Sequence, residues 1–240
     1  MKYIAGLIIM LVLIVGFTKY TGVNARPRDY SRAVLPAVFQ HFSDEVNISI
    51  EERYVLLETR GLPDHSSPYW GRKSESYEAP HRGMVVNPER IREQDLTLYI
   101  PLEPQRAKRI QPTRLGPIGI AVNGVPLFNQ YAGPGWPLDE EIASFDRYNG
   151  HPQEFGAYHY HVEPLYITQK DSGLVGFLLD GFPIYGRKDK NGTFPTDLDT
   201  ANGHFCPTTD YPDGIYHYHI TPTEPYISGG YRGEPGYVTH

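Results

Sequence analysis

Two short stretches of the sequence decide the fold: residues 157–161 read AYHYH, and residues 215–219 read IYHYH. Alternate side chains of an extended strand point to opposite faces, so the histidines of each stretch share one face and the tyrosines share the other. On a helix, the same spacing would turn the two imidazoles about 200° apart, and they could not converge. The two stretches therefore predict strands that each direct a pair of imidazoles toward one side of a sheet.

The sequence around these stretches occurs twice. Each copy has an apolar run that ends in Asn-Gly or Asp-Gly, a pattern typical of a β-hairpin. Each copy then has an Asp three residues before an Asn-Gly-His sequence, followed by the Tyr-His-Tyr-His stretch. The corresponding segments are 118–128 and 175–185, 146–151 and 199–204, and 157–161 and 215–219. Because three motifs keep the same order, we predict an internal duplication, with repeat units at about 118–167 and 175–227.

The composition of the 240-residue chain favours short strands joined by tight turns. It has 24 glycines and 22 prolines, and only 21% of its residues are charged, which disfavours long helices. We therefore predict a mainly β fold of sandwich-like antiparallel sheets built around the duplicated unit, with few short helices. Alternating apolar and polar residues predict strands at 47–59 and 95–102. Pro137 and the acidic residues after it predict a short helix over 137–143, and the basic segment 104–117 is interpreted as a seam between two layers.

The N-terminal segment is typical of an exported protein. Lys2 precedes an uncharged apolar run over residues 3–17, which suits the hydrophobic region of a signal peptide. We predict a signal peptide or N-terminal membrane anchor at 1–25, an N-terminal β layer at 26–110 and the duplicated region at 111–240, with the last two forming one compact domain. The expected location is periplasmic, cell-surface or secreted, with membrane contact only through the N-terminal segment.

Charge and cysteine content narrow the classes of function. The chain has 22 basic and 28 acidic residues, a net charge of −6, and the acids are scattered, so nucleic acid is not an expected partner. Cys206 is the only cysteine, so no intramolecular disulfide can form. Its thiol could be a metal ligand, although a buried apolar role is more common for a single cysteine. The sequence also lacks the G-x-S-x-G, H-E-x-x-H, phosphate-loop and dinucleotide motifs.

Histidines at matching positions of the two repeats predict transition-metal binding. A His-x-His strand supplies two imidazoles, and a third histidine follows the Asn-Gly of each repeat, where the glycine permits a left-handed backbone that would aim the ring inward. Either each repeat holds its own ion, or the two His-x-His strands face each other and share one site or a close pair. Asp146 and Asp199 could accept the proton of the far ring nitrogen. The candidate ligands are His151, His159, His161, His204, His217 and His219.

The histidines also have an ordinary structural interpretation. A single Tyr-His-Tyr-His strand is more often an aromatic sheet face with hydrogen-bonded histidines than a metal site. The repetition favours metal, and imidazole ligation suits copper, zinc, iron or nickel better than calcium or magnesium. His65 and His81 could add a ligand from the N-terminal layer, but solvated loop positions explain them more simply. Asp180 is interpreted as a turn residue, and the tyrosines as packing on the opposite face.

The doubled motif is similar to that of the YHYH domain proteins. The resemblance rests on the two Tyr-His-Tyr-His stretches, the Gly-His before each of them and the LDGFPIYG segment at 179–186. It spans about residues 60–233 and implies an extracytoplasmic domain whose naming motif lies at 158–161 and 216–219. The resemblance transfers no catalytic residue, because the family has no defined activity.

The sequence leaves two main interpretations of function, and it leaves open whether the protein is an enzyme. The first is an exported protein that binds copper, zinc or iron through these histidines, as a metal-dependent hydrolase or oxidase of a small substrate. The second is a non-catalytic surface or secreted module that binds carbohydrate or protein, with a structural metal or none. Metal buffering at exposed sites is a third. An open coordination position would favour catalysis, and a closed one would favour a structural role.

Overall fold

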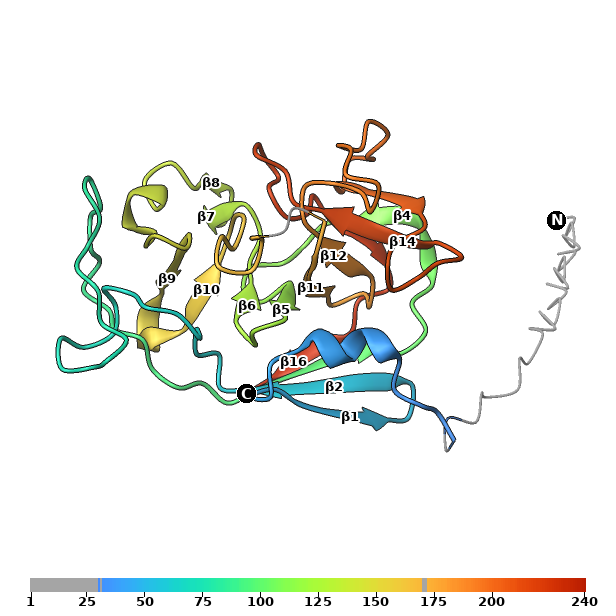
Figure 1. Cartoon of the computed structure of the whole chain (residues 1–240), viewed down its shortest axis with the longest axis horizontal. Coiled ribbons are helices and arrows are strands. Elements are labelled where there is room, and N and C mark those ends of the chain that lie inside the picture. Colours follow the sequence, from blue (N-terminus) through green and yellow to red (C-terminus); the bar gives the residue numbers. More distant parts are fainter. Residues whose placement is uncertain (1–29, 31, 170–171) are drawn as a thin grey trace, which may run out of the picture.

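Strands dominate the structure, a computed structural model that describes residue 30, residues 32–169 and residues 172–240. The helices of this described part are three short 3-10 helices, η1 (Ala37–His41), η2 (Ile142–Ser144) and η3 (Glu154–Gly156). The predicted mainly β class with few short helices is confirmed (Figure 1). The predicted signal peptide or anchor at 1–25 lies outside the described residues. Within the described residues, no helix has the length and hydropathy needed to cross a bilayer.

One eight-stranded sheet carries both Tyr-His-Tyr-His stretches, with its strands in the order β13-β14-β12-β11-β5-β6-β10-β9. The predicted hairpins at 118–128 and 175–185 are the antiparallel pairs β5–β6 and β11–β12, and β5 also pairs with β11. Outward from this central pair, each side of the sheet has a hairpin partner, then a Tyr-His-Tyr-His strand, then a Gly-His strand. The strands are β5 (Gly119–Ala121), β6 (Pro126–Leu127), β9 (Gly150–Pro152), β10 (Tyr158–Tyr160), β11 (Leu174–Leu178), β12 (Pro183–Tyr185), β13 (Gly203–Cys206) and β14 (Ile215–His219).

The large sheet is mixed in direction. β10 pairs with β6 in parallel, and β14 pairs with β12 in parallel, because each Tyr-His-Tyr-His strand rejoins the sheet through a long connection instead of a tight turn. β9 and β13 then pair antiparallel with these strands. His151 lies opposite His159, and His204 lies opposite His217. The pairing thus brings a third histidine beside each His-x-His pair.

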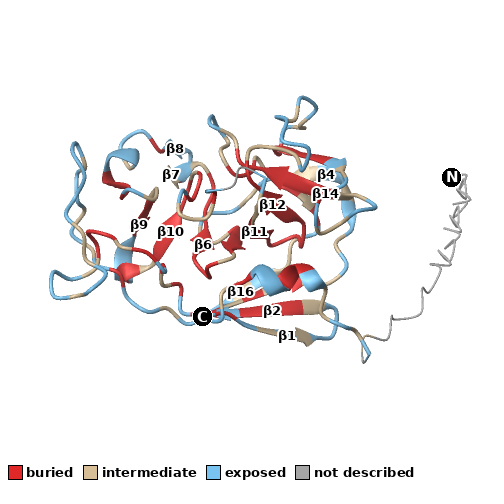
Figure 2. Ribbon diagram, viewed as in Figure 1, coloured by how far each residue is buried: buried red, intermediate tan, exposed pale blue. Residues whose placement is uncertain are grey.

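A second sheet shares one hydrophobic core with the first (Figure 2). Its order is β1-β2-β3-β16, with β1 at Asn47–Glu51, β2 at Tyr54–Thr59, β3 at Leu96–Pro101 and β16 at Tyr237–Thr239. Every second side chain of β3 is buried, as the alternation at 95–102 predicted. Phe39 of η1 stacks on Phe177 of β11 with ring centroids 4.7 Å apart. Because β16 pairs with β3, the last residues of the chain complete the N-terminal layer.

Three elements differ from the sequence prediction. The strand predicted over 47–59 is a hairpin of β1 and β2 that turns at residues 52–53, where Glu52 has a φ of 52°. The helix predicted over 137–143 is absent: β8 (Trp136–Pro137) pairs with β7 (Tyr131–Gly133), and η2 follows. The seven residues at 137–143 are too few to form a helix cooperatively. The seam predicted over 104–117 contains β4 (Arg106–Gln111), whose exposed basic side chains suit the two-stranded ribbon that it forms with β15 (Tyr231–Gly233).

Candidate metal centres

The two faces of β10 carry different chemistry, as the alternation of its residues predicted. Tyr158 and Tyr160 are wholly buried in the core. Tyr158 Oη donates a hydrogen bond to Asp146 Oδ2 over 2.7 Å, and Tyr160 Oη lies 2.8 Å from His65 Nε2. The histidines of the strand project from the opposite face. Packing and hydrogen bonding therefore account for the tyrosines.

The tyrosines of β14 have similar partners. Tyr216 Oη donates to Asp199 Oδ2 over 3.0 Å, and Tyr218 Oη donates to Asp180 Oδ2 over 2.6 Å. Asp180 also accepts the backbone N–H two residues later in its turn, and burial raises the pKa of its carboxyl to about 6. Asp199 and Asp146 thus bind tyrosine hydroxyls. The prediction that these two carboxylates hold histidine rings is wrong, because in each repeat the aspartate lies on the tyrosine side of the strand.

In the Asn-Gly pair before His151, the left-handed residue is not the glycine, as predicted, but the asparagine. The left-handed residue is Asn149, with a φ of 67°, whereas Gly150 lies in β9. A Cβ on Gly150 would overlap Tyr158 Oη, so the glycine is needed because the tyrosine ring crosses it. The second repeat has the same arrangement at Asn202, Gly203 and Tyr216.

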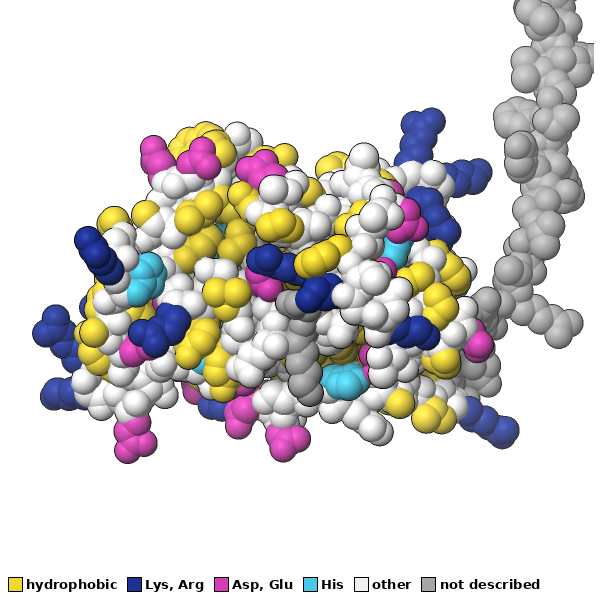
Figure 3. All heavy atoms as spheres, turned by 45° about the horizontal axis from the view of Figure 1, so that its top comes forward, with side chains coloured by type: hydrophobic (Ala, Val, Ile, Leu, Met, Phe, Trp, Pro, Cys, Tyr) yellow, Lys and Arg dark blue, Asp and Glu magenta, His cyan; other side chains and the backbone are white. Residues whose placement is uncertain are grey.

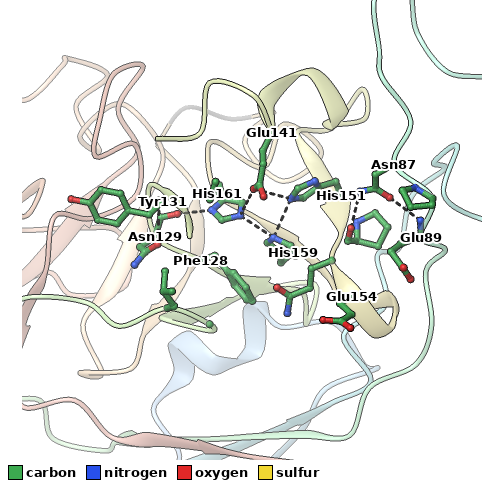
Figure 4. Close-up of a pocket in the computed structure, with 16 residues that line it drawn as sticks. Asn87, Glu89, Phe128, Asn129, Tyr131, Glu141, His151, Glu154, His159 and His161 are labelled. Atoms are coloured by element: carbon green, nitrogen blue, oxygen red, sulfur yellow. Dashed lines mark hydrogen bonds and ion pairs between the residues drawn. The ribbon is translucent and has the colours of Figure 1, made fainter. Parts of the chain in front are cut away.

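Three buried imidazoles meet at the first centre, which we define as His151, His159 and His161 (Figure 4). His159 Nε2 lies 3.2 Å from His151 Nε2 and 2.9 Å from His161 Nε2. Two nitrogen ligands of a tetrahedral zinc ion, each about 2.0–2.1 Å from the metal, lie about 3.3 Å apart. Both distances are close to the edge of such a tetrahedron, and the ligand atoms of all three histidines lie within 4.8 Å of one another.

Hydrogen bonds at the other ring nitrogens fix the tautomers of the first centre. His159 Nδ1 faces the Ala157 carbonyl oxygen at 3.0 Å, and His161 Nδ1 faces that of Asn129 at 2.5 Å. His151 Nδ1 lies 2.7 Å from Ser144 Oγ, whose own proton goes to a backbone carbonyl. The two carbonyl oxygens can only accept, and Ser144 Oγ accepts when its own proton goes to the Glu141 carbonyl, so in this arrangement all three Nδ1 atoms carry the proton. All three Nε2 atoms then direct lone pairs toward one point, the usual state of metal-binding histidine.

The imidazoles of the first centre are neutral at pH 7. Burial lowers the pKa of His151 to about 3 and that of His161 to about 4, and it holds the pKa of His159 well below its ordinary value. If the rings only bonded to one another, one Nε2 would have to carry a proton, and its Nδ1 lone pair would then face an acceptor. A third Nε2 would still lack a partner. A cation between the three lone pairs removes this conflict.

The second centre, defined as His204, His217 and His219, brings three Nε2 atoms together in a triangle. Its Nε2 atoms are separated by 3.2 Å between His204 and His217, 3.0 Å between His217 and His219, and 3.2 Å between His219 and His204. Their Nδ1 atoms face Asp197 Oδ1, the Ile215 carbonyl and the Gly186 carbonyl, at 2.7, 3.0 and 2.7 Å. Burial lowers the pKa of His217 to about 4 and also lowers that of His219.

Two further side chains reach the second centre. Asp189 Oδ1 lies 3.2 Å from His204 Nε2 and 3.3 Å from His219 Nε2. Cys206 Sγ lies 3.4 Å from His204 Nε2 and 3.9 Å from His217 Nε2, and burial raises the pKa of its thiol to about 11. Cys206 could be considered as a ligand from the sequence, whereas Asp189 could not, because no motif marks an aspartate in the turn at 189–192.

The two centres differ in the space around them. A cavity of about 330 Å³ opens onto the first centre, where the Phe128 ring stacks on His159 with centroids 4.1 Å apart (Figure 4). Glu141, also missed from the sequence, points toward the same imidazoles, with Oε2 3.7 Å from His151 Nε2 and 3.6 Å from His161 Nε2. Beside the second centre the cavity is only about 10 Å³, the space of about one water molecule.

The structure assigns the predicted histidines to two separate groups. Each repeat brings its own three imidazoles together at one end of the large sheet, from β9, β10 and the residue after β10, or from β13 and β14. The two His-x-His strands therefore do not face each other across one shared site. His65 is buried among tyrosines instead of lying in solvent, and His81 Nε2 lies 3.0 Å from the Phe145 carbonyl oxygen.

Together these features define a class of protein: a mainly β chain whose sheet buries two clusters of side chains that could hold metal ions, each centred on a Tyr-His-Tyr-His strand. The chain belongs to the YHYH family, because the family model described as YHYH protein matches residues 97–196 and 191–233. No curated protein and no solved structure matches the chain significantly.

Proposed function

We propose that this protein binds two transition-metal ions, one at each centre. The observation that carries the proposal is the set of partners at Nδ1. In all six histidines this nitrogen faces an oxygen that accepts its proton, so six Nε2 lone pairs converge in two groups of three. Imidazole donors suit copper, zinc or iron, and these remain the candidate metals.

The sequence supports a role outside the cytoplasm for this metal protein. The apolar run at residues 3–17 after Lys2 favours export to the periplasm, the cell surface or the medium. Basic and acidic side chains are interspersed over the face drawn in Figure 3, and the net charge is −6. We therefore propose a metal ion and a small molecule as partners, and not nucleic acid. The matching strand order on the two sides of the sheet supports the predicted duplication.

Elemental analysis of the full chain, purified without a histidine tag, tests the proposal. We expect about two equivalents of metal in the native protein, about one in His159→Ala or His217→Ala, and none in the double variant. His240→Ala, which changes an exposed histidine at the C-terminus, serves as the control and should keep both ions. Metal-free native protein that takes up neither zinc, copper nor iron, with an unchanged melting temperature in the double variant, would refute the proposal.

The cavity favours a second candidate function, catalysis at the first centre. An ion held by three histidines keeps a coordination position for water or substrate, and the cavity of about 330 Å³ leaves room for a small molecule beside it. Zinc there would support hydrolysis, and copper or iron would support oxidation of a small substrate. The second centre, which has little free space, fits the structural metal of a non-catalytic module. Turnover of ester or amide substrates, or oxygen consumption, that is lost in His159→Ala and kept in His217→Ala would support catalysis; equal activity in both would contradict it.

A further inference from the structure

We propose that the two centres bind metal in different ways: Asp189 and the Cys206 thiolate close the second centre, whereas the first centre takes an uncharged small molecule from its cavity as a ligand. This inference rests on the proposed function, because both centres must bind metal.

Four donor residues of the second centre, Asp189, His204, Cys206 and His217, have ligand atoms within 4.8 Å of one another, the spacing of ligands of one ion. His219 Nε2, 3.0 Å from His217 Nε2 and 3.2 Å from His204 Nε2, is a fifth donor, so an ion bound to all five would be five-coordinate. With bond lengths of about 2.3 Å to sulfur and 2.0–2.1 Å to nitrogen, a tetrahedral ion places its sulfur and nitrogen ligands about 3.6 Å apart. Cys206 Sγ lies 3.4 Å and 3.9 Å from Nε2 of His204 and His217, and 3.6 Å from Asp189 Oδ1. The distances of 3.2 and 3.3 Å from Asp189 Oδ1 to two imidazole nitrogens match the edge expected for oxygen and nitrogen ligands, about 3.3 Å.

The Cys206 thiol, 3.6 Å from Asp189 Oδ1, gives this carboxylate one weak hydrogen bond, and a cation would replace it. A carboxylate oxygen only accepts hydrogen bonds, and it faces two Nε2 atoms whose Nδ1 partners assign them lone pairs. Protonation of His204 could satisfy Asp189, but it would leave the Nε2 atoms of His217 and His219 facing each other at 3.0 Å with no proton between them. A metal ion satisfies all of these groups. When it binds, the S–H bond of Cys206 breaks, the proton passes to solvent, and the sulfur lone pair forms the bond to the metal.

The first centre lacks a matching set of closing ligands. Glu141 is the carboxylate that points at it, and its Oε2 lies 3.6–3.7 Å from two Nε2 atoms, farther than the 3.2–3.3 Å of Asp189 Oδ1 in the second centre. Its side chain is 34% exposed, in contrast to 15% for Asp189. The coordination position therefore faces the cavity, with the Phe128 ring as an apolar wall.

The cavity wall indicates the charge of the ligand. Three carboxylates and several amides line it, and the described residues that line it include neither Lys nor Arg. A further negative charge next to these carboxylates is unfavourable in a partly enclosed space, and this repulsion offsets part of the attraction of an anion to the metal ion. A neutral molecule that offers a nitrogen or oxygen donor to the metal, hydrogen bonds to the amides and an apolar face to Phe128 fits this wall. The three carboxylates are Glu89, Glu141 and Glu154.

Cobalt(II) substitution of the full chain tests the closing of the second centre. Cobalt reports each site through its visible d–d bands, and a bound thiolate adds a charge-transfer band in the near ultraviolet. We expect that band in the native protein and in His159→Ala, and its loss in Cys206→Ser with two equivalents of cobalt retained. Two bound cobalt ions without a thiolate band would overturn the inference and leave the proposed function standing. No cobalt at either centre would overturn both.

Ligand titration tests the opening of the first centre. Nicotinamide and nicotinate, which offer the same ring nitrogen and differ in charge, are added to the cobalt protein. Nicotinamide should shift the d–d bands that are missing in His159→Ala and leave those missing in His217→Ala unchanged. Nicotinate should bind about tenfold more weakly, the effect of about 1.4 kcal/mol of repulsion. Shifts at both centres or at neither, or equal binding of the two molecules, would overturn the inference.

Discussion

Replacement of Tyr158 by phenylalanine separates the two faces of β10. The side chain is wholly buried, and its hydroxyl donates to Asp146 Oδ2 over 2.7 Å. Tyr158→Phe keeps the ring and leaves this oxygen with Ser67 Oγ as its donor, at 2.6 Å. A hydrogen bond to a charged group contributes about 1.5–3 kcal/mol. We expect the free energy of unfolding to fall by that amount, which lowers the melting temperature of a domain of this size by roughly 3–12 °C.

Urea denaturation of the chelator-treated protein measures this loss, and elemental analysis of the untreated variant measures metal content. Two equivalents of metal should remain, because the hydroxyl lies on the face opposite the imidazoles. Tyr237→Phe, at a ring that is 48% exposed, is the control and should change stability little. If a folded Tyr158→Phe variant lost the metal of the first centre, or lost less than about 0.5 kcal/mol, the assignment of separate roles to the two faces would be refuted.

Three further predictions concern residues in or beside the two centres. Gly150→Ala would drive a Cβ into Tyr158 Oη and should cost about 1–3 kcal/mol in urea denaturation, whereas Gly71→Ala, with open space around it, should be nearly neutral. Ser144→Ala removes the acceptor of the His151 Nδ1 proton and should weaken zinc binding at the first centre about 10–100-fold in a chelator competition, while the affinity of the second centre stays unchanged. In the unfolded chain, His151 and His217 take up protons below the ordinary histidine pKa of 6.5. In the folded protein they stay neutral down to their lowered pKa values of about 3 and 4. The metal-free protein should therefore be fully stable above about pH 6.5 and lose up to about 1.4 kcal/mol per pH unit and histidine as the pH falls toward 4; a flat profile in pH-dependent urea titrations would contradict these shifts.

The sequence predicted the parts of the fold that depend on local pattern. A period of two placed His159 and Tyr158 on opposite faces, and the Asn-Gly and Asp-Gly turns marked the central hairpins correctly. Sheet order was less accessible, because the parallel pairing of β10 with β6 joins segments separated by a long connection. The prediction of one strand over 47–59 was wrong because no Gly or Pro marks the turn at 52–53, where Glu52 takes the left-handed conformation.

The sequence predicted the candidate metal ligands better than it predicted the groups that hydrogen-bond to their rings. The imidazoles could be proposed from the repeated motif, because both copies carry it. Glu141 and Asp189 could not, because they stand at different distances along the chain from the repeated aspartates Asp146 and Asp199. Asp146 and Asp199 were predicted to accept the Nδ1 protons of the histidine rings, yet at the first centre Ser144 Oγ accepts that of His151. Which acceptor lies beside a ring depends on the tertiary path of a loop, and spacing along the chain does not report it.

The pairing of His204 with His217 has a practical consequence for protein engineering. The connection between β13 and β14 is longer than that between β9 and β10, yet in both hairpins the Gly-His histidine lies opposite the first imidazole of its partner strand. The connection should therefore accept grafted peptides of other lengths without disturbing the donor atoms. A single inserted residue between the two histidines of the motif would instead turn the residues beyond it to the opposite face, so the two imidazoles would no longer share one side of the strand.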